Sequence, residues 1–184
     1  MWFIAVPTEI SAGSIRNYLL KSKQAGGGVL MEIAEILSLQ AVLANLKAGS
    51  KKQLLQELAA VAAKETGVHE RTIFDVLLER ERLGSTGVGK GIAIPHGKLG
   101  DIDRLYGVFA RFPAAVDFEA IDEQPVDLIF LLLAPESAGA DHLKALARIS
   151  RLLRDEEACI RLRGSESAEA LFALLTQTAE APAA

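Results

Sequence analysis

Apolar residues first recur at a clear helical spacing after residue 50. The stripe predicts a helix from Ser50, which forms a capping-box pair with Gln53, to a stop at Gly67. Its inward positions are Leu54, Leu55, Leu58, Val61 and Ala62. A second helix is predicted from about Glu70 to Leu83. The inner face of that helix carries Ile73, Val76 and Leu77.

Three apolar runs after this helix pair predict strands. The first, residues 91–94, is short and stops at Pro95, which has no N–H to donate and holds Ile94 extended. Residues 105–112 form the second. The third, residues 126–133, is apolar without interruption, which is typical of a central strand covered on both faces. Glycines break the chain between the second helix and the first strand.

Helical patterns return in the last third of the chain. We expect Asp141 to cap a helix that runs to about Leu153. Its inward positions are expected to be Leu143, Leu146, Ile149 and Leu153. A short segment at 157–162 and a helix at 167–178 follow. Because helices and strands alternate in blocks, the predicted fold class is α/β, a mixed sheet of four or five strands with helices on both faces.

Residues 1–30 differ from the rest of the chain. They have no sustained periodicity and end in a linker-like stretch that closes on Gly26-Gly27-Gly28. We expect them to be a non-native or disordered N-terminal extension, while the alternative is a genuine partner-binding arm. Residues 31–184 then form one domain of typical size with a loose tail after about residue 179.

Composition narrows the class of protein. Half of the residues are hydrophobic, so most of the chain can build a core. The net charge is −4, which argues against a nucleic-acid partner. The one cysteine, Cys159, cannot form an internal disulfide. We expect it to be a small buried apolar residue in a protein that occupies a reducing compartment. No apolar run is long enough to span a bilayer, so we expect a cytoplasmic protein with no membrane insertion.

The glycine-rich segment from Gly84 to Lys98 is the densest candidate for chemistry. Residues 84–90 fit the start of a phosphate-binding P-loop, G-x-x-x-x-G-K. However, Gly91 stands where that motif needs Ser or Thr, and the segment follows a helix and opens a strand, which reverses the P-loop order. Nucleotide binding is therefore the weakest of the hypotheses.

His96 is the stronger candidate within this segment. It follows a strand end at Pro95 and precedes Gly97, which predicts an imidazole at a rim with open space for another protein to approach. Neutral imidazole is also nucleophilic near pH 7. The alternative is a loop histidine without chemistry.

Two further residues can converge on His96. Arg80 is predicted on the inner face of its helix, where a guanidinium needs an anionic partner or a structural salt bridge. His142 lies at the start of a helix, whose free N–H groups favour anions, just after the central strand. The remaining histidine, His69, is expected at the surface.

Two segments together resemble a known family. Residues 80–98, Arg-Glu-Arg-Leu-Gly-Ser-Thr-Gly-Val-Gly-Lys-Gly-Ile-Ala-Ile-Pro-His-Gly-Lys, resemble the active-site segment of phosphotransferase-system enzyme IIA domains of the mannitol/fructose type. Residues 141–154, Asp-His-Leu-Lys-Ala-Leu-Ala-Arg-Ile-Ser-Arg-Leu-Leu-Arg, resemble the second signature of that family. Both look most like the nitrogen-related branch, and the resemblance covers about residues 31–178.

The resemblance implies a mechanism and partners. His96 would accept a phosphoryl group from an HPr-like carrier, His142 would hydrogen-bond the phosphoryl oxygens, and Arg80 would offset their charge. Ser85 and Thr86 are weaker candidates for phosphoryl binding. No cofactor and no metal would be needed, because the donor is already a phosphorylated protein. In the nitrogen-related branch the phosphorylation state is a regulatory signal to targets such as potassium transport proteins or sensor kinases.

The sequence alone leaves a second function open. A sugar-specific enzyme IIA would pass the phosphoryl group to an enzyme IIB during fructose- or mannitol-type uptake. The lack of any fused IIB, IIC or HPr-like segment in the sequence favours the regulatory phosphocarrier, although such partners also exist as separate subunits.

Deleting residues 1–30 should leave the domain intact, because nothing in their pattern predicts packing against it. Limited proteolysis should trim the chain near residues 21–28 and leave a core with an unchanged melting temperature. A loss of unfolding free energy above roughly 1–2 kcal/mol, large for a single domain, would contradict this expectation.

Overall fold

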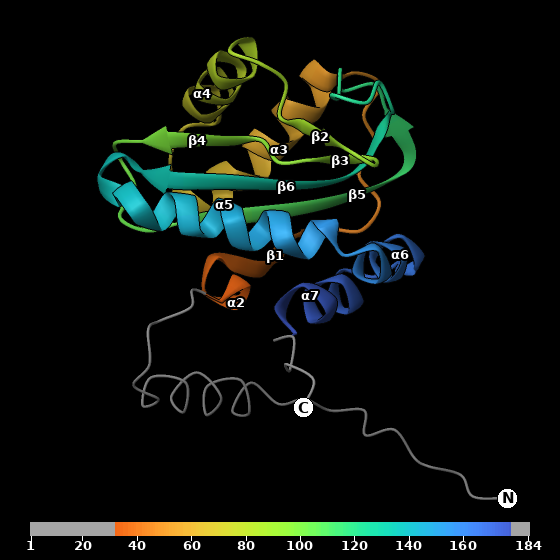
Figure 1. The fold of residues 1–184 in the computed structure, drawn as a ribbon. Coiled ribbons are helices and arrows are strands. Elements are labelled where there is room, and N and C mark those ends of the chain that lie inside the picture. The colour runs from red at the N-terminus through yellow and green to blue at the C-terminus, as the bar shows by residue number, and fades with distance from the viewer. Residues whose placement is uncertain (1–31, 178–184) are drawn as a thin grey trace, which may run out of the picture. The chain divides into compact units, whose positions relative to one another are not determined.

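The apolar run near residue 130 forms the central strand of a mixed sheet. In the computed structural model, which describes residues 32–177, this strand is β6 (Val126–Pro135), and nine of its ten residues are buried (Figure 1). Fully burying one such apolar side chain contributes about 1.5–3 kcal/mol. The prediction of a strand covered on both faces is confirmed.

Within the described residues, six strands build the sheet, rather than the four or five expected. Their order is β1 (Leu37–Leu43), β5 (Tyr106–Val116), β6, β3 (Ile92–Ala93) and β2 (Gly87–Gly89), with β4 (His96–Leu99) also paired to β6. β1 is parallel to β5, and β3 and β4 are parallel to β6. The other two pairs, β5 with β6 and β2 with β3, are antiparallel, so the sheet is mixed as predicted.

Two strands that the sequence did not predict, β2 and β4, lie in the glycine-rich segment or at its end. β2 and β3 form a hairpin whose two turn residues, Lys90 and Gly91, both have positive φ (56° and 76°). This geometry is a type I′ turn, the connection that best matches the twist of paired strands. β2 therefore lies in a segment predicted to be a loop, whereas β3 confirms the strand predicted at residues 91–94.

Helices cover both faces of the sheet, as predicted. In Figure 1, α5 (Gly139–Arg154) lies across the front face, and α3 (Lys51–Thr66) lies behind the sheet. α4 (Glu70–Arg82) packs beside α3 and against β4, and α7 (Ala168–Thr176) packs against β1. The shorter elements are α2 (Ile33–Ile36), the 3-10 turn η1 (Glu136–Ala138) and α6 (Glu156–Gly164).

The helix caps agree with the sequence in most cases. The Ser50 hydroxyl accepts the N–H of Gln53 at the start of α3, and Gly67 ends that helix with φ 74°. His69 is exposed and caps α4, where its ring accepts the N–H of Arg71. Both helix boundaries were therefore predictable from local signals.

The start of α5 differs from the prediction. The helix begins at Gly139, directly after η1, and Asp141 does not cap it; its carboxylate pairs with Lys144 at 3.0 Å. Leu143 was expected inside, yet it is 67% exposed, because the inward positions of the first turns belong to His142 and Ala145. The face of α5 that packs on the sheet therefore carries His142, Ala145, Ile149 and Leu153.

Gly97 brings α4 close to the sheet. The residue is buried in β4, and a Cβ built there would lie 2.5 Å from Cγ1 of Val76 on α4. The space beside Gly97 is therefore occupied by a helix of the same chain. The open space predicted from the sequence concerned the His96 imidazole, which this contact does not test.

The predictions for residues 1–30 and for the tail after about residue 179 lie outside the described residues. Within residues 32–177, no helix combines the length and the apolar character that a membrane crossing requires.

Replacing Gly97 with alanine should destabilise the domain. The added methyl group forces α4 outward or Val76 into another rotamer, and such overpacking costs about 1–3 kcal/mol. Chemical denaturation should show this loss. The matched control is Gly164→Ala at the end of α6, where a Cβ meets nothing within 4 Å, and its unfolding free energy should change by less than about 0.5 kcal/mol.

Candidate functional site

Three elements meet at His96. It is the first residue of β4 and is half-buried, whereas the sequence placed it just after a strand. The end of α4 brings Arg80 to its ring, and the first turn of α5 brings His142. The three residues singled out from the sequence therefore lie together.

Arg80 determines the protonation pattern of the His96 ring. Its Nε donates a hydrogen bond to Nε2 of His96 at 3.0 Å. Because guanidinium nitrogen only donates, Nε2 must be the unprotonated nitrogen that accepts. The proton then lies on Nδ1, which is 2.9 Å from the carbonyl oxygen of Ile94 and donates to it. The nucleophilic lone pair of His96 is thus on Nε2.

The charge of Arg80 is not balanced by a carboxylate in the described part of the chain. Besides His96, its guanidinium contacts the carbonyl oxygen of Gly84, to which Nη1 donates at 3.0 Å. No ion pair of Arg80 occurs within residues 32–177, so the salt bridge considered from the sequence is absent there. A free cationic group therefore lies beside the nucleophilic nitrogen.

His142 faces the same site from the other side. Its ring centroid lies 5.7 Å from that of His96, and the two rings are tilted by 58°. The residue is 8% exposed, and its buried Nε2 has no hydrogen-bond partner among the described residues. Since buried polar atoms are nearly always paired, this nitrogen is available for a ligand.

Both imidazoles are held toward their neutral form. Burial lowers the pKa of His96, and the nearby Arg80 guanidinium lowers it further, against opposing contributions from the Ile94 carbonyl and Glu81. Burial also lowers the pKa of His142, with smaller effects from His96 and Lys98. A neutral His96 keeps its Nε2 lone pair free at physiological pH.

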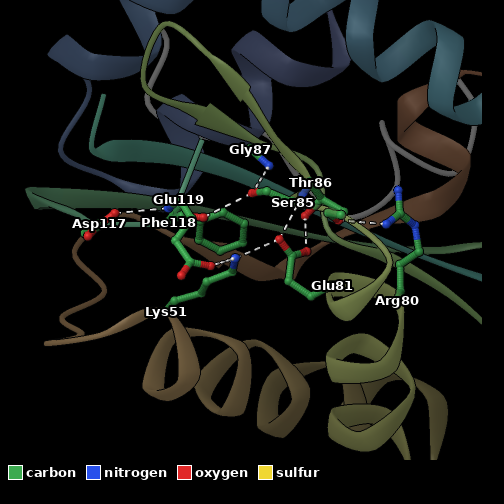
Figure 2. Close-up of polar contacts among 10 residues, drawn as sticks. Lys51, Arg80, Glu81, Ser85, Thr86, Gly87, Asp117, Phe118 and Glu119 are labelled. Atoms are coloured by element: carbon green, nitrogen blue, oxygen red, sulfur yellow. Dashed lines mark hydrogen bonds and ion pairs between the residues drawn. The ribbon is translucent and has the colours of Figure 1, made fainter. Parts of the chain in front are cut away.

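The hydroxyl groups of Ser85 and Thr86 have partners within the protein (Figure 2). Ser85 donates to the carbonyl oxygen of Phe118 at 3.1 Å and accepts the N–H of Gly87. The buried Thr86 donates its hydroxyl to Glu81 at 2.6 Å. These contacts hold the segment that precedes β2, and each hydroxyl already donates its one proton, so donating to a bound phosphoryl group requires a rearrangement.

Sequence analysis missed Glu81 and Lys51. The Glu81 carboxylate is buried and forms an ion pair with Lys51 at 3.0 Å. The spacing could have revealed Glu81, because it follows the buried Ile73 and Leu77 by eight and four residues and so continues their face of α4. Nothing in the local sequence marks Lys51, which α3 brings in by tertiary packing.

Lys90 lies at a hairpin turn and not in a phosphate cradle. Its ammonium group pairs with Glu156 at 2.6 Å, and its N–H donates to the Asp122 carboxylate. The P-loop hypothesis loses its support, since the turn N–H already has an anionic partner and no helix follows the loop.

The remaining possibilities for chemistry are the cysteine and a cluster of metal-ligating side chains. Cys159 is buried, as predicted, and burial raises the pKa of its thiol. Across the described chain, no cluster of three His, Cys, Asp or Glu side chains is arranged to hold a metal ion.

Comparisons with known proteins show which proteins the chain is similar to in sequence and fold. The nitrogen regulatory protein of Bradyrhizobium diazoefficiens is 58% identical over 145 residues, covering 79% of this chain and 95% of that protein. The crystal structure of IIA-Ntr from Neisseria meningitidis superimposes with a TM-score of 0.75 at 38% identity, covering 78% of this chain and 99% of that one. IIA mannitol from Escherichia coli shares the fold, with a TM-score of 0.65 at 23% identity over 75% of this chain and 97% of that one.

A family model gives the same answer. The model for the phosphoenolpyruvate-dependent sugar phosphotransferase system, EIIA 2, matches residues 35–178. This match spans both histidine-bearing segments and nearly all of the described fold. The chain therefore belongs to the EIIA 2 family of the phosphotransferase system.

Proposed function

We propose that the protein is a regulatory phosphocarrier of the nitrogen-related phosphotransferase system. It accepts a phosphoryl group on His96 from an HPr-like carrier protein and signals through its phosphorylation state. The observation that carries the proposal is the pairing of an unprotonated His96 Nε2 with the guanidinium of Arg80, which has no carboxylate partner in the described chain.

The chemistry requires little more than positioning and charge. Nε2 of His96 attacks the phosphorus of the carrier's phosphohistidine, the bond to the carrier's nitrogen breaks, and that nitrogen keeps the electron pair. Nδ1 retains its proton and its hydrogen bond to the Ile94 carbonyl, so the ring stays oriented throughout. Phosphoryl transfer depends mainly on such alignment and on stabilising the equatorial oxygens.

Arg80 and His142 supply that stabilisation. The Arg80 guanidinium leaves Nε2 as the new bond forms and pairs with the incoming phosphoryl oxygens, for which its planar fork is well suited. His142 presents its unpartnered Nε2 side to the same oxygens and donates a hydrogen bond when that nitrogen carries the proton. Both residues assist without becoming phosphorylated.

The relatives support a regulatory role over sugar uptake. Among the proteins described above, the sequence relative at 58% identity is named as a nitrogen regulatory protein, and the solved relative at 38% identity is named IIA-Ntr. The likeness to IIA mannitol at 23% identity concerns the fold alone. We therefore place this protein in the signalling branch, with regulatory proteins rather than an enzyme IIB as its downstream partners.

His96→Ala should abolish phosphorylation by phosphoenolpyruvate, enzyme I and an HPr-like carrier, while the fold is retained. His142→Ala and Arg80→Ala should slow transfer roughly 10- to 1,000-fold, if each supplies about 1.4–4 kcal/mol of charge stabilisation. Mass spectrometry should map the phosphate to His96, and the label should be acid-labile and base-stable.

His69→Ala is the matched histidine control, because this residue is exposed and only caps α4, and it should be labelled at the wild-type rate. Full labelling of His96→Ala, or a phosphate on Ser85, Thr86 or His142, would show that the assignment is wrong.

Transfer to the protein should stay constant as the pH falls to the ordinary imidazole value of 6.5 and should decline only below it. The reason is the lowered pKa of His96: protonation of Nε2 removes the nucleophile, and it occurs below the usual range. The unfolded chain binds this proton more readily, so unfolding free energy should also decrease as the pH falls from 6.5 through the folded pKa.

An NMR titration of the His96 ring, run beside the transfer assay, checks this behaviour. Arg80→Ala should raise the pKa of His96, because a neighbouring positive charge is removed. A His96 pKa above 6.5 in the wild-type protein would contradict the expectation.

A further inference from the structure

Glu81 is a buried carboxylate that touches no predicted site residue except Thr86. Its side chain is 5% exposed, and it accepts three donors: the Thr86 N–H at 2.8 Å, the Thr86 hydroxyl at 2.6 Å and the Lys51 ammonium at 3.0 Å (Figure 2). Lys51 in turn reaches Glu119 at 2.8 Å and lies over the Phe118 ring. Three donors therefore hold the carboxylate in place.

The position of Glu81 in α4 does not favour the stability of the fold. Glu81 is the penultimate residue of α4, where the helix dipole disfavours a negative charge. Burial of a carboxylate adds a desolvation cost that even a good ion pair often fails to recover. A residue in such a position is better explained by what it holds in place.

A chain of hydrogen bonds connects Glu81 to His96. Glu81 fixes the N–H of Thr86, and the carbonyl of the same residue accepts the N–H of Ile94 at 3.0 Å. The carbonyl of Ile94 accepts the proton on Nδ1 of His96 at 2.9 Å. The bond that orients the His96 ring thus depends on a segment that Glu81 anchors.

A second series of hydrogen bonds leads from His96 back to Glu81, so the two series form a closed network. Arg80, the neighbour of Glu81 in α4, donates to Nε2 of His96 and also to the carbonyl of Gly84. Gly84 lies two residues before Thr86 and donates its own N–H to the carbonyl of Glu81 at 3.2 Å. Both nitrogens of His96 are therefore oriented by groups that meet at Glu81, one path through its carboxylate and the other through its main-chain carbonyl.

We propose that Glu81 is a positioning residue for phosphoryl transfer. It anchors this closed network of hydrogen bonds and thereby holds His96 with its proton on Nδ1 and its lone pair on Nε2. It acts through Thr86, Ile94 and Arg80, and it does not contact the phosphoryl group. The effect of Glu81 on the transfer rate rests on the proposed function. Its effect on the orientation of the His96 imidazole can be measured whether or not His96 is phosphorylated.

The charge of Glu81 and its hydrogen bonds make separable contributions. Arg80 and Glu81 from α4, His142 from α5 and Lys98 from β4 are the charged or titratable groups around the two imidazoles. The negative charge of Glu81 opposes the effect of Arg80 on the pKa of His96. Removing the charge while keeping the hydrogen bonds should therefore lower that pKa and leave the ring orientation unchanged.

The test compares Glu81→Ala with Glu81→Gln in the full-length chain. ¹⁵N-labelled protein reports the His96 tautomer and pKa by NMR, and carrier-dependent labelling reports the transfer rate. Glu81→Ala should give a mixture of tautomers and a rate lower by roughly 10- to 100-fold, the scale of a small misplacement of reacting groups. Glu81→Gln keeps an acceptor for the Thr86 N–H, so it should keep the tautomer, lower the pKa and transfer within a few-fold of wild type.

Thr86→Val and Thr86→Ser repeat the comparison without altering the carboxylate. Valine removes only the hydroxyl contact and should shift the tautomer population partly, and serine should restore it. These milder variants decide the matter if Glu81→Ala does not fold. Glu79→Ala is the matched control, because it removes an exposed carboxylate from the same helix and should change neither NMR property nor the transfer rate.

The measurements distinguish a failure of the proposed function from a failure of the positioning role of Glu81. A wild-type protein that accepts no phosphoryl group on His96 defeats the proposed function, while the NMR comparison still decides the role of Glu81. A wild-type tautomer and pKa in both Glu81→Ala and Thr86→Val would overturn the positioning role, whatever the transfer rate.

Discussion

The hydrogen bond from Nε of Arg80 to Nε2 of His96 is the interaction on which the site depends. It joins the end of a helix to the start of a strand, and it defines which ring nitrogen is free of a proton. It also keeps a cationic group next to the nitrogen that, under the proposed function, receives a dianionic phosphoryl group. In that proposal, one contact prepares both the nucleophile and the stabilisation of charge.

That contact requires α4 and β4 to lie unusually close. Gly97 permits this approach, because any larger residue there meets Val76. The constraint explains why a residue without a side chain follows the nucleophile directly. On the same helix, Glu81 anchors the loop before β2, so one rigid element positions both sides of the His96 ring.

Local patterns carried most of the fold and much of the site. The stripe of α3, the Ser50 and Gly67 caps, and the apolar run of β6 each depend on neighbours a few residues away, and all three were predicted. Arg80 was predicted on the inner face of α4 from its spacing, and it lies there beside His96. The exclusion of a P-loop likewise followed from the order of helix and strand, which is a local property.

Tertiary structure decided what depends on distant partners. β1 and β4 pair with strands far along the chain, and β2 has only three residues, so their patterns are weak. The same holds for the start of α5, where η1 directly precedes the helix and Asp141 does not cap it. The sequence by itself determined which residues can do chemistry, since nucleophilicity and charge belong to side chains. Only the packing of α4 against β4 decided the tautomer of His96, and only the packing of α3 against α4 gave Glu81 its partner Lys51. Both depend on distances between segments far apart in the chain.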